Sequence, residues 1–172
     1  PRDGWPRPVA PDESLKRGKG NLVVYIGVMG WQDGVNTLIE AVDVLAHELT
    51  FTDLHVAIIG DGAAGESLRA QARELGVEEW VEFVGWTDDE DLLSRYLATA
   101  DACVCPETSS PLNDHSTFIK VMEYMASDTP VVAFDLPDTR YSAGDAALYA
   151  PSGDVKSFAL RIREALSDNS VR

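Results

Sequence analysis

Apolar residues occur along the chain in two alternating kinds of segment: short runs and longer stretches with a helical period. The runs are mostly unbroken, which is typical of parallel strands buried on both faces. They lie at residues 22–26, 54–59, 81–84, 102–105 and 131–134, with a shorter one at 147–149. Apolar residues three and four apart predict helices at about 35–49, 66–75, 88–98, from 117 onward, and at 154–166.

This alternation of strand and helix predicts an α/β protein with a Rossmann-like doubly wound parallel sheet. A chain of 172 residues is long enough for one domain with a sizeable core. Residues 1–20 are rich in Pro, Gly and charge, so we predict a linker or lead-in there and a single domain over 21–172. Folds of this kind carry many functions, so the pattern says little about function by itself.

The charge balance narrows the class of partner. Formal net charge is −15, from 29 acidic and 14 basic residues. Such a surface argues against nucleic acid, because phosphate backbones bind clusters of Lys and Arg. It predicts a salt-loving source, and the domain should be more stable in molar salt than in dilute buffer. Equal stability in a denaturant titration at both salt concentrations would contradict this.

Hydropathy bears on localisation. We see no long apolar run, so we expect no membrane span and no signal peptide, and a cytoplasmic protein. The first residue is Pro rather than Met, so we expect a piece of a longer chain. Any membrane contact would then be peripheral and made by the missing part.

The stretch from Pro111 to Asp135 organises the rest of the chain. It contains a polar loop, a short helix, a tight connection and a buried strand. One face of the helix is apolar, and the other carries Ser116, Lys120, Glu123 and Ser127. Ser116 or Asp114 is expected to cap the helix. Open α/β sheets bind ligands at the carboxyl ends of their strands, and this polar face is expected to lie there.

Four stretches of the chain resemble the group 1 (family 4) retaining glycosyltransferases. They occur in the family's order over residues 21–167, and they read LVVYIG, HVAIIGDG, VEFVGWTDDEDLLSRYLATADACVCP and KVMEYMASDTPVVAFD. The last resembles the second half of the family's Glu-x7-Glu region. The resemblance implies the C-terminal, nucleotide-sugar-binding half of a GT-B fold.

The resemblance also implies an activity. The full enzyme would transfer a sugar from a nucleotide diphosphate sugar to an acceptor hydroxyl, with retention at the anomeric carbon and without a metal or other cofactor. The acceptor, a glycan or a lipid-linked sugar, would be bound largely by a missing N-terminal domain. The chain alone is therefore expected to bind nucleotide without turnover.

The loop after the first strand departs from the family. Gly27 and Val28 lie where a backbone can approach a ligand, although the dinucleotide fingerprint GxGxxG is absent. The family places an Arg and a Lys in this region to neutralise the diphosphate, and here those positions are Val28 and Asp33. Diphosphate binding is therefore expected to use backbone N–H groups with help from Lys120, and Ser116 and Thr117 at the helix start.

The Glu-x7-Glu motif is only half present. Glu123 matches the second Glu, which in the family holds the ribose; the alternative is an ion pair with Lys120 on a solvated face. Eight residues earlier lies His115, with Asp114 beside it. Asp114 would replace the first Glu with a one-residue shift, and His115 is either a sugar or phosphate contact or a plain loop residue.

Three further positions are candidates for the donor site. Gly60 and Gly62 flank Asp61 after the second strand, where the family's Gly-Asp-Gly lies near the donor; the alternative is a simple turn. Trp86 follows the third strand, in the segment that lies along the nucleobase in the family. It packs either on the base or in the core or its rim, since large aromatic residues usually serve packing.

Cys103 and Cys105 are the only cysteines, and alternation along a strand places them on one face as small buried side chains. A metal site would need more ligands nearby. Two other functions stay open: a non-catalytic sugar-nucleotide-binding module, and another nucleotide-dependent α/β enzyme. The second would be a GT-B-type sugar-nucleotide epimerase or a dinucleotide oxidoreductase, of which the missing fingerprint disfavours the latter.

Overall fold

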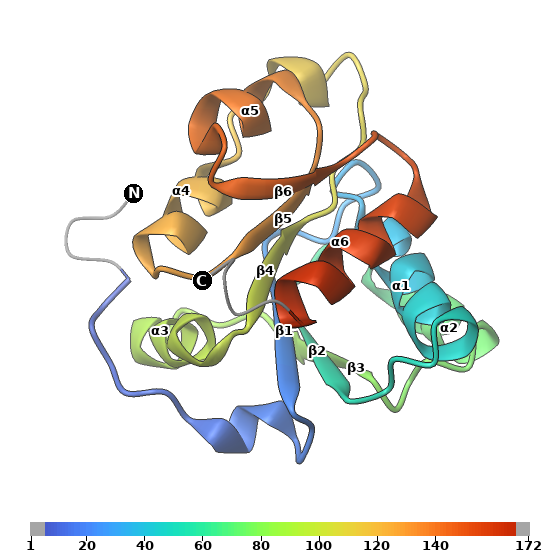
Figure 1. The fold of residues 1–172 in the computed structure, drawn as a ribbon, viewed down its shortest axis with the longest axis vertical. Helices are drawn as coiled ribbons and strands as arrows, with labels where there is room; N and C mark the ends of the chain where they lie inside the picture. The colour runs from blue at the N-terminus through green and yellow to red at the C-terminus, as the bar shows by residue number, and fades with distance from the viewer. Residues whose placement is uncertain (1–5, 168–172) are drawn as a thin grey trace.

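A computed structural model describes residues 6–167 and shows one six-stranded sheet with helices on both faces (Figure 1). The strand order is β3-β2-β1-β4-β5-β6, and all neighbouring strands are parallel. The strands are β1 (Asn21–Ile26), β2 (Leu54–Ile59), β3 (Val81–Gly85), β4 (Ala102–Cys105), β5 (Val131–Phe134) and β6 (Ala147–Ala150). The predicted Rossmann-like fold is confirmed, since the order reverses between β1 and β4.

Two groups of helices cover the sheet (Figure 1). One face is covered by α1 (Val35–Asp43), α2 (Gly65–Glu74) and α6 (Val155–Ser167), and the other by α3 (Glu90–Thr99) and α4 (Ile119–Ala126). The larger core cluster lies under the first group and includes Leu38, Ile58 and Phe158, all fully buried. Among residues 6–167, no helix has the length and apolar character to cross a bilayer.

The observed helices differ from the predicted ones in a few details. α1 ends at Asp43, and the predicted remainder forms a π-helical turn (Val44–Glu48). α5 (Pro137–Ala143) was not predicted. Its Asp138 accepts a hydrogen bond from the backbone N–H of Phe118 at 2.8 Å. Phe118 has a non-helical backbone (φ −90°, ψ 88°), and α4 begins at Ile119 rather than at residue 117. Neither Ser116 nor Asp114 caps α4, and the Ser116 hydroxyl instead donates to the carbonyl of Leu112.

Tyr124 of α4 lies between β1 and β4 where the two strands part. These strands pair only at Val23 and Val24, so Ile26 has no partner in β4. The Tyr124 hydroxyl accepts a hydrogen bond from the N–H of Ile26 at 2.9 Å and lies 3.4 Å from its carbonyl oxygen. The side chain thus satisfies buried backbone groups while the sheet opens for the site.

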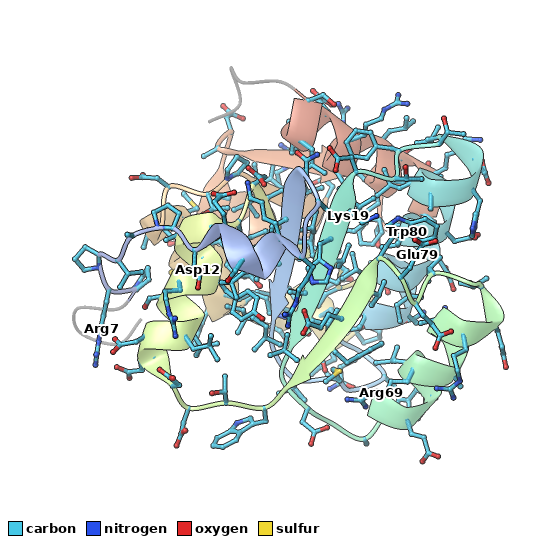
Figure 2. The ribbon with its side chains drawn as sticks, turned by 90° about the horizontal axis from the view of Figure 1, so that it is seen from below. Arg7, Asp12, Lys19, Arg69, Glu79 and Trp80 are labelled. Carbon is cyan, nitrogen blue, oxygen red and sulfur yellow. The ribbon has the colours of Figure 1, made fainter. Side chains whose placement is uncertain are left out.

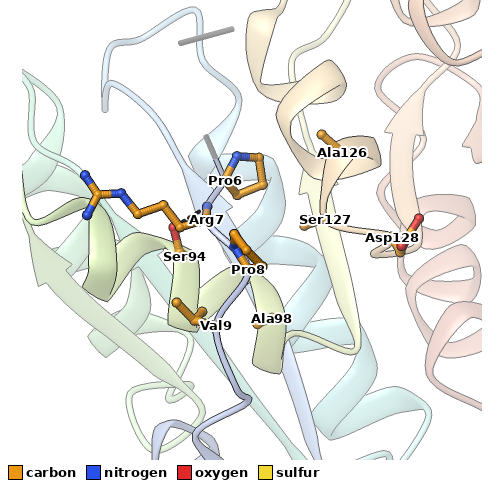
Figure 3. A pocket seen from close by; sticks show the side chains of 9 residues that line it. All are labelled: Pro6, Arg7, Pro8, Val9, Ser94, Ala98, Ala126, Ser127 and Asp128. Atoms are coloured by element: carbon orange, nitrogen blue, oxygen red, sulfur yellow. Dashed lines mark hydrogen bonds between the residues drawn. The ribbon is translucent and has the colours of Figure 1, made fainter. Parts of the chain in front are cut away.

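The lead-in, residues 6–20, runs along α3 and the sheet (Figure 2). Arg7 donates to Glu90 and Asp91 at the start of α3, and the N–H of Asp12 donates to Thr99 at its end. A hollow of about 260 Å³ remains between the lead-in, α3 and the end of α4 (Figure 3). These contacts hold the lead-in against the domain. The lead-in also contains a 3-10 turn (Glu13–Lys16).

Both cysteines are buried, as predicted. They do not share a core cluster, however: Cys103 lies in the cluster under α3 and Cys105 in the larger one. Cys105 ends β4, and its thiol lies 3.0 Å from Oε2 of Glu107. The simple alternation of a strand therefore fails at its last residue.

Candidate functional site

Two hollows lie side by side where β1 and β4 end. Both are lined by Ile26, Gly27 and Val28. The larger, of about 380 Å³, also includes Asp33, Glu107 and residues 117–120 and 123. The smaller, of about 230 Å³, continues past Ile59, Gly60, Asp61, Trp86, Thr87 and Leu93. This is the place where open α/β sheets bind ligands.

Glycine packing holds the loops around the hollows together. Gly60 has φ +138°, and a Cβ there would collide with the carbonyl oxygen of Gly27. Gly34 has φ +70°, and a Cβ there would collide with the carbonyl oxygen of Pro106. The loops after β1, β2 and β4 therefore approach one another as closely as backbones can, and only glycine fits.

Asn113 ties two of these loops together. Its side-chain amide donates to the carbonyls of Gln32 at 2.9 Å and Thr108 at 2.8 Å, and the residue is 3% exposed. Our sequence analysis missed it. A polar side chain in an otherwise ordinary loop gives no sign that it will be buried, so only the structure assigns this role.

A buried ion pair lies beneath the larger hollow. The ammonium group of Lys120 contacts the carboxylate of Glu107, and their side chains are 14% and 1% exposed. The ammonium also lies 3.3 Å from the hydroxyl of Tyr25 and 4.4 Å from the centre of its ring. Burial is the largest single influence on the pKa of Lys120 and lowers it, but the charge and hydrogen bond of Glu107, together with Tyr25 and Cys105, hold that pKa above its ordinary value.

Glu107 is the functional candidate that the sequence analysis missed. The alternative considered for Glu123 was an ion pair with Lys120, and the structure pairs Lys120 with Glu107 instead. A carboxylate two residues after a buried strand lies at the strand's carboxyl end, where binding residues gather. The place of Glu107 just after a predicted strand is therefore the sequence feature that could have identified it.

The structure shows the surroundings of Val28 and Asp33, the two residues of the loop after β1 that depart from the family pattern. Val28 is 61% exposed at the junction of the hollows. The carboxylate of Asp33 accepts a hydrogen bond from the N–H of Gly30 at 2.8 Å. Asp33 therefore closes this loop, which a lysine at the same position could not do because its side chain has no acceptor.

Most of the predicted donor-site residues come together. Gly27, Val28, Thr117, Lys120 and Glu123 line the larger hollow, and Gly27, Val28, Gly60 and Trp86 line the smaller one. Trp86 is 71% exposed, so of the roles considered for it the core role is wrong.

Four predicted residues line neither hollow: Gly62, Asp114, His115 and Ser116. A Cβ at Gly62 would lie 2.5 Å from the carbonyl oxygen of Met29, so this glycine serves loop packing. His115 is exposed on a 3-10 turn (Asn113–His115). Asp114 accepts a hydrogen bond from Ser109 through Oδ2, while its Oδ1 is buried and has no hydrogen-bond partner among residues 6–167.

Comparisons with known proteins agree with this geometry. The family model described as "Glycosyl transferases group 1" matches residues 20–168. A lipopolysaccharide core biosynthesis glycosyltransferase, LpsE of Rhizobium meliloti, is 31% identical over 88% of this chain and 41% of its own length. The O-antigen chain mannosyltransferase B of Escherichia coli is 29% identical over 87% of this chain and 38% of its own length.

A solved structure shows the same fold. Anabaena HepE in complex with UDP-glucose superimposes with a TM-score of 0.73 at 20% identity, over 88% of this chain and 41% of that one. The chain thus spans about two fifths of the length of the relatives that it matches.

Proposed function

The chain belongs to the group 1 glycosyl transferase family, and from this we propose that it is the donor-binding half of a two-domain enzyme. The enzyme would transfer a sugar from a nucleoside diphosphate sugar to an acceptor hydroxyl. One observation carries the proposal: the paired hollows at the carboxyl ends of β1 and β4, with Lys120 and Glu123 of α4 on one side and Trp86 on the other.

Each part of the donor has a matching surface. The base would occupy the smaller hollow, where the exposed ring of Trp86 offers a stacking face. The diphosphate would cross Gly27 toward the start of α4, where backbone N–H groups favour anions. The ribose joins the base to the diphosphate. The carboxylate of Glu123 lines the larger hollow and would accept hydrogen bonds from the ribose hydroxyls.

We extend the proposal to the stereochemistry and the metal requirement of the reaction. The transfer would retain the configuration at the anomeric carbon and would need no metal, and the family resemblance supports both points. An ammonium group and backbone N–H groups aimed at the leaving diphosphate would supply electrostatic stabilisation in the transition state. The family resemblance also implies that Asp114 or His115 would contact the donor sugar, although both lie outside the two hollows in this structure. The acceptor, a glycan or a lipid-linked sugar, would be held by the rest of the enzyme.

A thermal-shift panel of UDP, GDP, ADP, CMP and NAD in high salt tests the proposal. A ligand at 100 times its dissociation constant adds about 2.7 kcal/mol, and each kcal/mol moves the midpoint by roughly 2–4 °C. We expect one nucleoside diphosphate to shift the midpoint and Glu123→Ala to abolish that shift. The matched control is Glu74→Ala, at the exposed end of α2 on the opposite edge of the sheet.

The outcomes separate the candidate functions. A shift from no nucleotide, or one that Glu123→Ala leaves intact, contradicts the proposed site. A shift from NAD alone would favour an oxidoreductase. Val28 and Asp33 favour a non-catalytic binding module as the second candidate, since no lining side chain of the loop after β1 is cationic. In that case the full-length protein would bind the nucleotide but show no sugar transfer with any acceptor.

A further inference from the structure

We propose that Lys120 is the cationic contact of the donor diphosphate and that Glu107 is the positioning residue that holds it there. This inference rests on the proposed function and deepens it. The resemblance predicts cations at positions 28 and 33, and the chain has Val and Asp there. The structure supplies a cation to the same hollow from the opposite side, on α4.

The environment of Lys120 directs one N–H toward the ligand. An ammonium group has three donors, and among residues 6–167 Glu107 and Tyr25 accept from it. A Cβ at position 27 would lie 2.9 Å from the ammonium nitrogen and 2.8 Å from the Tyr25 hydroxyl. Gly27 therefore leaves the ammonium open to the hollow, and its own backbone lies on the proposed path of the diphosphate.

The other charged residues that line the larger hollow are acidic, so binding of a diphosphate there depends on the positive charge of Lys120. Among residues 6–167 it is the only cationic residue that lines the larger hollow, where it lies with Asp33, Glu107 and Glu123. The carboxylate of Asp33 is held by Gly30, on the loop, and that of Glu107 by Lys120 itself. Attraction for a diphosphate must then come from Lys120 and from backbone N–H groups at the start of α4.

Glu107 has a specific task in this arrangement. A lysine that is mostly buried tends to lose its proton, because burial disfavours the charged form. The groups that face Lys120 and bear on its charge are Glu107, Tyr25, Cys105, Asp33, Glu123 and, beyond the start of α4, Asp138. Of these, Glu107 makes the ionic contact, and it counteracts the effect of burial on the pKa of Lys120.

The first experiment compares UDP with uridine and GDP with guanosine on the 172-residue protein at pH 7.5, by calorimetry. The measured quantity is the ratio of diphosphate affinity to nucleoside affinity. A hydrogen bond to a charged group contributes enough for Lys120→Met/Glu107→Gln to lower this ratio by about 10- to 100-fold. Nucleoside affinity should stay within about twofold, since a base and ribose do not contact the ammonium.

The double variant is used because it leaves no buried charge unpaired, so that it folds. The matched control is Lys156→Met/Glu48→Gln, which removes an exposed Lys–Glu pair at 2.9 Å on the α6 face. The control should leave the ratio unchanged.

The second experiment tests Glu107 as a positioning residue through pH. Glu107→Gln removes the main charge that opposes the effect of burial, so the pKa of Lys120 falls and the ammonium loses its proton as pH rises. The affinity ratio of this variant should fall by about tenfold or more between pH 7.5 and 10, because neutral lysine binds phosphate poorly. The wild-type ratio should stay flat, and division by nucleoside affinity removes titration of the base itself.

The possible failures are distinguishable. If no nucleotide binds the wild-type protein, the proposed function fails and this inference fails with it. If a diphosphate binds and the double variant keeps its affinity ratio, the role of Lys120 is wrong while the proposed function stands. A flat pH profile in Glu107→Gln overturns the positioning role alone, since a purely structural Glu107 would change stability without changing this ratio.

Discussion

Replacing Lys120 by methionine lowers the free energy of unfolding by about 3–5 kcal/mol, the usual cost of leaving one partner of a buried ion pair without the other. Glu107 is 1% exposed and accepts from Lys120, so its buried carboxylate loses its charge partner when the ammonium is removed. The only other donor to it among residues 6–167 is the thiol of Cys105, a weak one. Urea denaturation in molar salt, where surface charge is screened, measures the loss.

A second variant distinguishes the effect of the lost ion pair on stability from the effect of lost side-chain packing. Lys120→Met/Glu107→Gln should recover most of the stability, because buried pairs are often replaceable by neutral groups at little net cost. Lys156→Met, in the exposed pair with Glu48, should change stability by less than about 1 kcal/mol. If the single and double Lys120 variants are equally destabilised, the buried charge is not the cause.

Much of the fold follows from the sequence because local pattern and global burial agree. The run at Leu54–Ile59 is apolar except for His55, and the structure buries every residue of β2. The helix predicted over about 66–75 ends as α2 at Glu74, and Gly76, with φ +67°, follows its end. Contacts that are distant in sequence are not visible in the pattern: Asp138 of α5, twenty residues away, accepts the N–H of Phe118, the residue just before α4.

The site was predictable where a motif or a strand end marks it. Gly27, Lys120 and Glu123 were found from their places on a loop and a helix face, and they line one hollow. Glu107 and Asn113 were missed because their roles depend on burial and on partners 13 and 81 positions away. The family resemblance could not supply them either, since Glu107 acts through Lys120 in a site whose expected loop cations are absent.

These residues form one arrangement, not separate contacts. Asn113 holds the loop after β4 against the loop after β1, and Gly34 lets the two backbones touch at Pro106. That contact fixes the distance between Glu107, which follows Pro106, and Gly27 across the hollow. Lys120 then lies between Glu107 and the backbone over which the diphosphate is proposed to pass.

Replacing Gly34 by alanine should therefore destabilise the contact between the loops after β1 and β4. The added methyl would collide with the carbonyl oxygen of Pro106, a backbone atom that cannot move without shifting the loop after β4. We expect a loss of about 2–5 kcal/mol of unfolding free energy, from left-handed strain of about 1–2 kcal/mol and overpacking of about 1–3 kcal/mol.

Gly76 provides the matched control for that strain. Its φ of +67° is close to the +70° of Gly34, but nothing lies within 4 Å of a Cβ added there. Gly76→Ala should cost only the left-handed strain, about 1–2 kcal/mol, so the difference between the two variants measures the contact at Pro106. Gly34→Ala should also weaken the diphosphate-dependent part of nucleotide binding, because it moves Glu107 and with it Lys120, whereas Gly76→Ala should not. Equal stability losses in the two variants would mean that the loop after β4 yields freely, and the close approach of the two loops would then not be what sets the width of the hollow.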